Sequence, residues 1–135
     1  PLLREGDQRA LVLGTGGASK AVWYGLKKLG VTPTLVSRTP KEGMLGYEAL
    51  TAEVMQEYTV IVNCTPLGMA PDIKSFPPIP YELITARHLL FDCVYNPEET
   101  VFLQKGKAQG ATIRNGMEML YGQAKAAWRI WNNEQ

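Results

Sequence analysis

The sequence predicts an α/β protein in which helices cover both faces of a doubly wound parallel sheet, giving three layers, α/β/α. Short apolar runs alternate with stretches of helical periodicity along the chain, which is the pattern of successive strand–helix–strand units. Residues 10–13 and 60–62 are apolar at every position, as strands buried on both faces of a parallel sheet are. Right-handed crossovers then place helices on both faces, and we expect residues 1–135 to form one domain.

The predicted elements follow one another with turn residues between them. Residues 40–46 and the proline-rich segment 70–80 are expected to be loops, and residues 81–85 to form one helical turn. The first helix ends at Gly30, and apolar residues recur along it at Ala21, Val22, Leu26 and Leu29. The expected strands are residues 10–13, 34–36, 60–62, 88–94 and 111–114, and the expected helices are residues 18–29, 47–58, 100–109 and 117–131.

Composition narrows the class of protein. The chain has 135 residues and a net charge of +1, with scattered basic residues, so it has no electrostatic basis for binding nucleic acid or a membrane surface. No apolar run approaches the ~20 residues of a membrane-spanning helix, and residues 1–7 lack the pattern of a signal peptide. Cys64 and Cys93 form no C-x-x-C motif, so we expect reduced thiols in a cytoplasmic protein. Because Pro1 is not a natural start, we expect the chain to begin partway through a longer protein or at a cut made for expression.

The central motif joins the first strand to the first helix and reads Gly14-Thr15-Gly16-Gly17-Ala18-Ser19. A glycine turn between a strand and a helix is the context of a Rossmann-like dinucleotide-binding loop. Gly14 would make the tight turn, and Gly16 would let the backbone approach a pyrophosphate that the N–H groups at the helix start then face. Ser19 occupies the third position of the motif, where Gly or Ala is usual. The alternative is a glycine-rich turn that binds no ligand.

The end of the second strand selects the nucleotide. An NAD site has an acidic residue here to hold the ribose 2′-OH, whereas this chain has Ser37, Arg38 and Thr39, followed by Lys41. A guanidinium pairs with a phosphate and stacks on an adenine, so this segment favours NADP(H). The alternative is that Arg38 and Lys41 are solvated loop charges.

Ligands of such sheets bind beyond the carboxyl ends of the strands, at the point where strand order reverses. Five loops follow the predicted strands, and all of them contain unusual residues. They are residues 14–19, 37–41, 64–69, 93–97 and 115–119. Their agreement is stronger support for a ligand site than any single motif.

Together these motifs resemble a known family, shikimate dehydrogenase, over nearly the whole chain but only over the C-terminal, NADP-binding half of that enzyme. The motifs are the glycine loop, Ser37-Arg38-Thr39, Asn63-Cys64-Thr65-Pro66-Leu67-Gly68-Met69, Asp92-Cys93-Val94-Tyr95-Asn96-Pro97 and Asn115-Gly116-Met117-Glu118-Met119-Leu120 with Gln123-Ala124. The resemblance implies reduction of 3-dehydroshikimate to shikimate with NADPH, on the cytoplasmic route to chorismate and the aromatic amino acids.

The resemblance also assigns roles to residues. It implies that the pyrophosphate is wrapped by Gly14, Thr15, Gly16, Gly17 and Ala18, and that the adenosine ribose and its 2′-phosphate meet Ser37, Arg38, Thr39 and Lys41. Thr65, Cys93, Gly116 and Met119 then border the cofactor, and Tyr95 and Gln123 reach the substrate. The family usually has Asn where this chain has Ser37, and a larger apolar residue is common where it has Cys93.

No catalytic residue is predicted in this chain. The family's catalytic Lys and Asp belong to an N-terminal substrate domain whose motifs do not occur here. His88, at the start of a strand, is interpreted as a surface or capping residue, and Tyr95 as too weak an acid at neutral pH. Cys64 and Cys93 are interpreted as thiols lining the cofactor cleft, and Asp92 as the acceptor of a structural hydrogen bond. The chain alone is therefore expected to bind NADP(H) without turnover.

Two other functions stay open: a non-catalytic NADP-binding module or regulatory paralogue, and an NAD-using quinate/shikimate dehydrogenase, which Arg38 disfavours. The related domain of glutamyl-tRNA reductase is a more distant possibility. Trp128 and Trp131 on the last predicted helix suggest core packing or docking against the absent domain. We expect a monomer, or a homodimer formed through an exposed apolar face.

Overall fold

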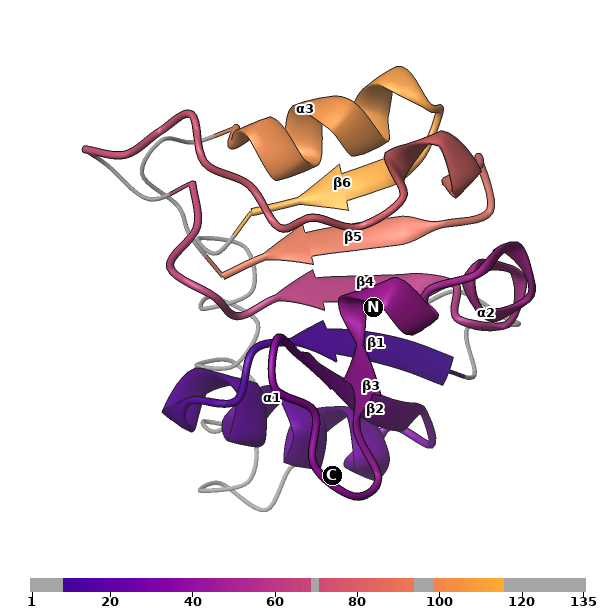
Figure 1. Ribbon diagram of the computed structural model, residues 1–135. Coiled ribbons are helices and arrows are strands. Elements are labelled where there is room, and N and C mark those ends of the chain that lie inside the picture. The colour runs from indigo at the N-terminus through magenta and orange to yellow at the C-terminus, as the bar shows by residue number, and fades with distance from the viewer. Residues whose placement is uncertain (1–8, 69–70, 94–98, 116–135) are drawn as a thin grey trace, which may run out of the picture.

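The computed structural model describes residues 9–68, 71–93 and 99–115. Within them six parallel strands form one sheet with helices on both faces (Figure 1), which confirms the predicted α/β architecture. The strands are β1 (Arg9–Leu13), β2 (Thr32–Ser37), β3 (Leu45–Gly46), β4 (Val60–Asn63), β5 (Leu89–Asp92) and β6 (Thr112–Arg114). The helices are α1 (Gly17–Lys28), α2 (Ala52–Glu57) and α3 (Val101–Ala108), with short 3₁₀ turns η1 (Tyr47–Ala49) and η2 (Tyr81–Leu83).

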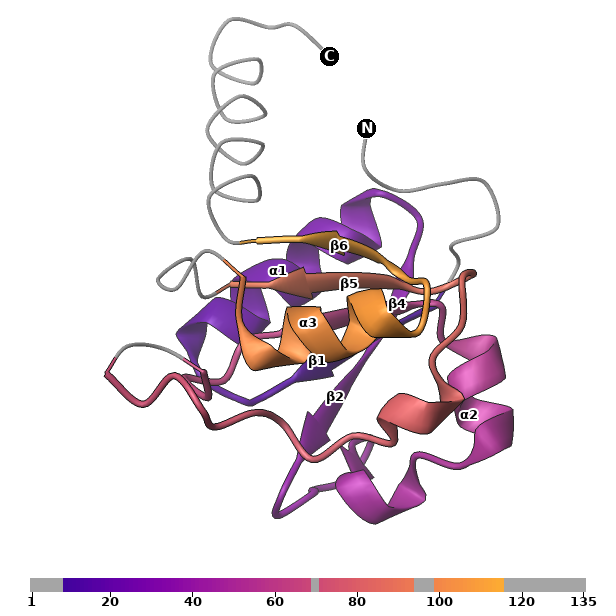
Figure 2. The same ribbon diagram turned by 90° about the horizontal axis from the view of Figure 1, so that it is seen from above.

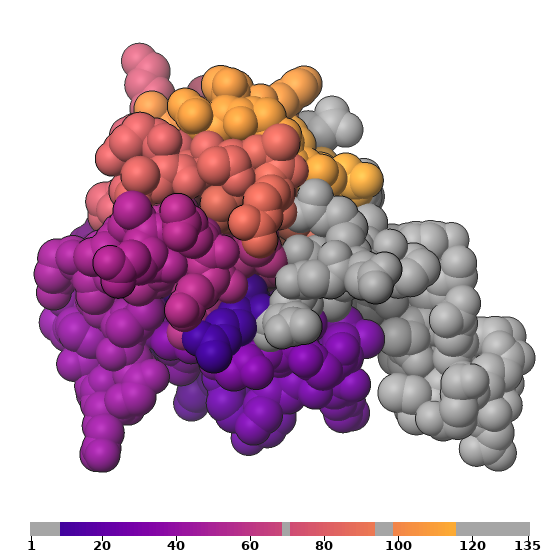
Figure 3. All heavy atoms as spheres, turned by 90° about the vertical axis from the view of Figure 1, so that its right-hand side faces the viewer, coloured from indigo at the N-terminus to yellow at the C-terminus, as the bar shows by residue number. Residues whose placement is uncertain are grey.

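The strand order is β3-β2-β1-β4-β5-β6, so the chain winds outward from β1 in one direction and then returns to build the other half from β4. In the central register Leu13 lies between Val36 of β2 and Asn63 of β4. The arrowheads of β1, β4, β5 and β6 point to one edge of the sheet in Figure 1, and β2 and β3 pair in parallel with them. Figure 3 shows the opposite edge, where the indigo start of β1 reaches the surface.

Two apolar layers enclose the sheet, one on each face. Alternate residues of the central strands point into different layers. Leu11 and Ile61 belong to the layer that includes α3, and Val12 and Val62 belong to the layer that includes α1. Figure 2 shows α1 on one side of the sheet and α3 on the other. All four of these strand residues are 1% exposed or less, which is why the strands read as continuous apolar runs.

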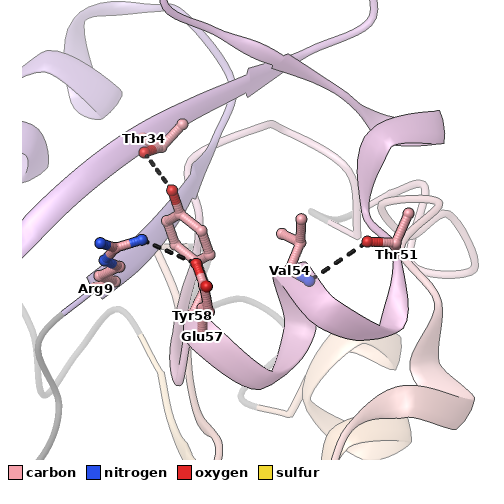
Figure 4. A network of polar contacts seen from close by, with 6 residues as sticks. All are labelled: Arg9, Thr34, Thr51, Val54, Glu57 and Tyr58. Atoms are coloured by element: carbon pink, nitrogen blue, oxygen red, sulfur yellow. Dashed lines mark hydrogen bonds and ion pairs between the residues drawn. The ribbon is translucent and has the colours of Figure 1, made fainter.

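The short helix α2 is capped at its start and contacts the sheet from its C-terminal end (Figure 4). Thr51 caps it by accepting a hydrogen bond from the Val54 N–H, at 3.4 Å. Beyond the last turn, the hydroxyl groups of Tyr58 and Thr34 are 3.1 Å apart, and Glu57 pairs with Arg9 at 2.9 Å. This ion pair is more than half exposed and therefore contributes little, roughly 0–1 kcal/mol, so packing rather than charge holds the helix.

Several predicted elements need correction. The expected loop 40–46 contains a sixth strand, β3, and it escaped prediction because a two-residue strand shows no alternation. The expected helix 47–58 is divided into η1 and α2, because Thr51 adopts an extended conformation and begins a new helix. In α1 the buried residues are Ser19, Val22 and Leu26, whereas Ala21 and Leu29 are exposed. The predicted helix 117–131, with Trp128 and Trp131, lies outside the described residues.

His88 is a buried residue, which corrects the expected surface position. It is 2% exposed, and it precedes β5 at the edge where the strands begin. Its Nδ1 accepts a hydrogen bond from the Thr85 N–H at 3.0 Å, which leaves Nε2 to donate to the Met55 carbonyl at 2.7 Å. Nε2 therefore ties His88 to α2, whereas Nδ1 holds the turn that precedes β5.

Among the described residues no helix is long and apolar enough to cross a bilayer.

Candidate functional site

The turn after β1 requires glycine for reasons internal to the protein. Gly14 has a φ of +109°, a conformation that residues with a Cβ rarely adopt. Its N–H donates to the Val36 carbonyl at 2.9 Å, so the turn crosses the end of β2. An ideal Cβ at this position would lie 3.3 Å from Thr65 Cγ2 and 3.4 Å from the Cys64 carbonyl. Gly14 thus allows the loops after β1 and β4 to touch.

The next two glycines have no such internal reason. A Cβ on Gly16 or Gly17 would meet no described atom within 4 Å, and neither residue has a positive φ. Gly16 caps α1 without a side-chain hydrogen bond, and the first turn of the helix contains no acidic residue. The backbone N–H groups of this first turn therefore border an open surface, which is suited to a phosphate group.

Ser19 explains how this loop tolerates a residue other than Gly or Ala at the third motif position. Its side chain is completely buried, and its hydroxyl donates to the Gly16 carbonyl at 2.6 Å. The polar group is satisfied within the helix, so the residue packs close to the sheet at no cost in unpaired hydrogen bonds.

The loop after β2 presents the predicted basic residues to solvent. Ser37 accepts a hydrogen bond from the Thr39 N–H at 3.1 Å, which shapes the turn, and Arg38 is exposed. Burial raises the pKa of the Tyr47 phenol, and the positive charge of Arg38 partly offsets this rise. Tyr47 thus lies within electrostatic reach of Arg38, a neighbour that was not predicted because it follows the unforeseen strand β3.

Asn63, at the end of β4, organises the loop that follows it. Its Oδ1 accepts hydrogen bonds from the N–H and the hydroxyl of Thr65, at 3.0 and 2.6 Å. Its Nδ2 donates to the Leu67 carbonyl at 3.3 Å and to Asp92 Oδ1 at 3.1 Å. Asn63 received no role in the sequence prediction, although a polar residue that ends a continuous apolar strand is a usable signal.

Asp92 is completely buried at the end of β5 and joins this loop to α3. Its second oxygen, Oδ2, accepts a hydrogen bond from the Thr100 hydroxyl at 2.6 Å. The same hydroxyl caps α3 by accepting from the Leu103 N–H at 3.4 Å. The prediction that Asp92 accepts a structural hydrogen bond is therefore confirmed.

Cys64 and Cys93 follow β4 and β5 and lie side by side, with their sulfur atoms 3.5 Å apart. Both are partly buried against the apolar layer that includes α1. Within the parts of the chain that the structure describes, no cluster of three or more His, Cys, Asp or Glu side chains could hold a metal ion.

Most of the predicted site residues lie at the edge of the sheet where the strands end, in the strand ends, the loops that follow them or the first turn of α1. These are Gly14, Thr15, Gly16, Gly17, Ala18, Ser37, Arg38, Thr39, Lys41, Thr65 and Cys93. Tyr95, Gly116, Met119 and Gln123 lie outside the described residues. The contacts that each makes with a ligand stay predictions.

Three features define a dinucleotide-binding domain of the Rossmann class. They are the strand order, the switch point between β1 and β4, and the glycine loop that joins β1 to α1. A shikimate dehydrogenase (NADP(+)) of Salinibacter ruber is 38% identical over 146 residues, which cover 91% of this chain and 50% of the relative. A shikimate dehydrogenase (NADP(+)) of Archaeoglobus fulgidus is 35% identical over 139 residues, with coverage of 93% and 51%.

Among solved structures, shikimate 5-dehydrogenase from Thermus thermophilus, in complex with NADP(H) and shikimate, matches with a TM-score of 0.71 and 32% identity. This match covers 92% of the present chain and 49% of the Thermus chain. No protein-family model matches the chain. The chain is thus homologous to the shikimate dehydrogenases, as its motifs indicated, and it spans about half the length of the curated relatives it matches.

Replacement of Thr100 by Ala tests the buried link between β5 and α3. We expect Thr100→Ala to lower the free energy of unfolding by about 2–4 kcal/mol, because it removes a helix cap and the donor to a buried carboxylate. Thr51→Ala is the matched control, since Thr51 caps α2 in the same way but is exposed. It should cost only about 1 kcal/mol in urea unfolding. Equal losses in the two variants would contradict the proposed importance of the Asp92 contact.

Proposed function

We propose that this chain is the cofactor-binding half of an NADP-dependent shikimate dehydrogenase, with residues 1–135 as its NADP-binding domain. The observation that carries the proposal is the open glycine cradle at the switch point, in a chain homologous to enzymes of that name. The relative from Thermus thermophilus was solved with NADP(H) and shikimate. In this reading the chain works in the cytoplasm, on the route to chorismate and the aromatic amino acids.

The pyrophosphate of the cofactor would lie over the glycine loop. Gly14 sets the turn, while Gly16 and Gly17 leave the space that two phosphate groups need. The N–H groups of the first turn of α1 and the helix dipole then favour the negative charge. Thr65, which Asn63 holds in place, would border the same cleft from the β4 side.

The adenosine end would meet the loop after β2. Arg38 is exposed and able to pair with a 2′-phosphate, and Lys41 adds a second positive charge in the same loop. Residues 37–41 contain no carboxylate to repel that phosphate. This composition favours NADP(H) over NAD(H), and so favours the proposal over an NAD-using quinate/shikimate dehydrogenase.

The nicotinamide and the substrate would lie on the β5 and β6 side of the switch point. The resemblance assigns Cys93, Gly116 and Met119 to the nicotinamide half. It assigns Tyr95 and Gln123 to the substrate. The substrate pair, shikimate and 3-dehydroshikimate, would then be held between this domain and a separate substrate domain.

NADPH supplies a hydride from C4 of its nicotinamide, so the reaction also needs an acid to protonate the oxygen of the reduced carbonyl. Within residues 9–68, 71–93 and 99–115 the two buried titratable candidates are engaged elsewhere. Asp92 is bonded to Asn63 and Thr100, and His88 lies at the opposite edge of the sheet. We therefore place the acid in the substrate domain.

Gly16→Ala separates a ligand requirement from a structural one. A methyl group there meets no described atom, so the free energy of unfolding should change by less than about 1 kcal/mol, whereas NADPH affinity should fall by about tenfold or more. Gly25→Ala is the matched control, because Gly25 also faces open space but lies near the far end of α1. Fluorescence titration with NADPH should show no loss for Gly25→Ala. Unchanged affinity in Gly16→Ala would contradict the cradle.

Arg38→Asp tests the selection of the 2′-phosphate. We expect NADPH affinity to fall by at least about tenfold and NADH affinity to change little, because only NADPH has the phosphate that pairs with the guanidinium. Arg87→Asp is the control with the same change in charge, since Arg87 is exposed just before β5, at the opposite edge. A similar loss of affinity for both nucleotides would show that Arg38 has only a structural role.

The 135-residue chain by itself should bind NADPH and should not oxidise shikimate, because the proton-transfer group is assigned to the substrate domain. The measurement is NADPH formation, followed by absorbance, in a mixture of chain, NADP⁺ and shikimate. Binding without turnover supports the division of roles. Turnover by the chain alone would overturn it.

A further inference from the structure

Two cysteines that are 29 residues apart in the sequence meet at the edge of the sheet where the strands end. Asn63 and Asp92 lie opposite each other at the ends of β4 and β5. Cys64 and Cys93 are the next residues along the chain, so they also lie side by side. Adjacent strands lie about 4.8 Å apart, within the range of roughly 4.4–6.8 Å that a disulfide spans between Cα atoms. The sulfur atoms, at 3.5 Å, already face each other.

The backbone holds both residues at this separation. The Cys64 N–H donates to the Leu13 carbonyl at 2.9 Å, and the Cys93 N–H donates to the Asn63 carbonyl at 3.0 Å. Both side chains are partly exposed, so a small oxidant in solution can reach them. A bond between them therefore needs only side-chain rotation and a slight approach of the two strand ends.

The two thiols also differ in chemistry because they share a hydrogen bond. The hydrogen bond with Cys64 lowers the pKa of Cys93, against the opposing effects of burial and of Asp92. The same bond together with burial raises the pKa of Cys64. The thiolate is the nucleophile in thiol oxidation. One reactive sulfur and one protonated neighbour form the arrangement in which oxidation of the first is followed by closure with the second.

We propose that Cys64 and Cys93 form a redox-active dithiol site that a hydroperoxide closes to an intramolecular disulfide, and that closure weakens nucleotide binding. The Cys93 thiolate attacks the peroxide oxygen, gives a sulfenic acid and releases one molecule of water or alcohol. The Cys64 sulfur then attacks the sulfenic sulfur, and a second water leaves with the Cys64 proton. Two thiols are oxidised, one peroxide is reduced, and a dithiol reductant reverses the change.

The effect on the nucleotide follows from the position of Cys64, and this part of the inference rests on the proposed function. The Cys64 carbonyl lies 3.4 Å from the point that a Cβ of Gly14 would occupy, so Cys64 packs against the glycine turn. Closure shortens the sulfur separation from 3.5 Å to the bond length of about 2.05 Å. The slight approach of the strand ends that accompanies closure moves Cys64 relative to the glycine turn.

The test treats the full chain with hydrogen peroxide, maps disulfides by peptide mass spectrometry and titrates NADPH before and after. We expect a peptide that links Cys64 to Cys93, a fall in NADPH affinity of about tenfold and recovery of both with dithiothreitol. Absence of the linked peptide overturns the site, and a linked chain with unchanged affinity overturns the effect on binding. Failure of the reduced chain to bind NADPH contradicts the proposed function instead, while the peptide map still decides whether the disulfide forms.

Single serine variants test the order of the two steps. With the sulfenic-acid reagent dimedone, Cys64→Ser should be labelled at Cys93, and Cys93→Ser should give little label at Cys64. Circular dichroism checks that both variants are folded. Equal labelling of the two variants would contradict Cys93 as the residue that attacks first.

Discussion

One buried carboxylate holds the working edge of this domain together. Asp92 has no exposure to solvent, and its two oxygens receive hydrogen bonds from Asn63 at the end of β4 and from Thr100 at the start of α3. Asn63 in turn holds Thr65 through two further bonds. The ends of two strands, a helix cap and the loop beside the glycine turn therefore share one network. A buried polar group of this kind is costly unless it is hydrogen-bonded, so the network favours keeping these elements in their relative positions.

The glycines around this edge divide into one that the fold requires and two that leave open space at the start of α1. Gly14 has a positive φ and touches Thr65 and the Cys64 carbonyl, so folding alone accounts for it. Gly16 and Gly17 have ordinary backbone conformations and face open space. Glycine in a helix start costs conformational entropy without improving packing. Gly25 also faces open space, so openness alone does not mark a phosphate site. The argument for one is the position of Gly16 and Gly17 at the start of α1, at the edge where the strands end.

Sequence alone could predict the parts of the fold that depend on local pattern. The strand 10–13, the turn at Gly14 and the start of α1 were predictable because a continuous apolar run, a glycine turn and helical periodicity follow one another. Strand β3 was not, since two residues carry no period and its pairing with Val36 and Ser37 is non-local. The burial of His88 depends on the Met55 carbonyl, 33 residues away, and no local rule detects that partner. The sequence could predict which loops form the candidate site. It could not predict the hydrogen bonds between them, such as those of Asn63 with Thr65 and Asp92.

The arrangement of polar groups also bears on the proposal that proton transfer belongs to another domain. An acid must release its proton to the substrate, so it needs an accessible oxygen or nitrogen with a spare hydrogen-bonding position. Asp92 is near the proposed nicotinamide site, but both of its oxygens are committed to the network that holds the loops. Using it as an acid would require breaking the bonds that position Thr65. In the proposed function the acid is therefore a group outside this network of hydrogen bonds.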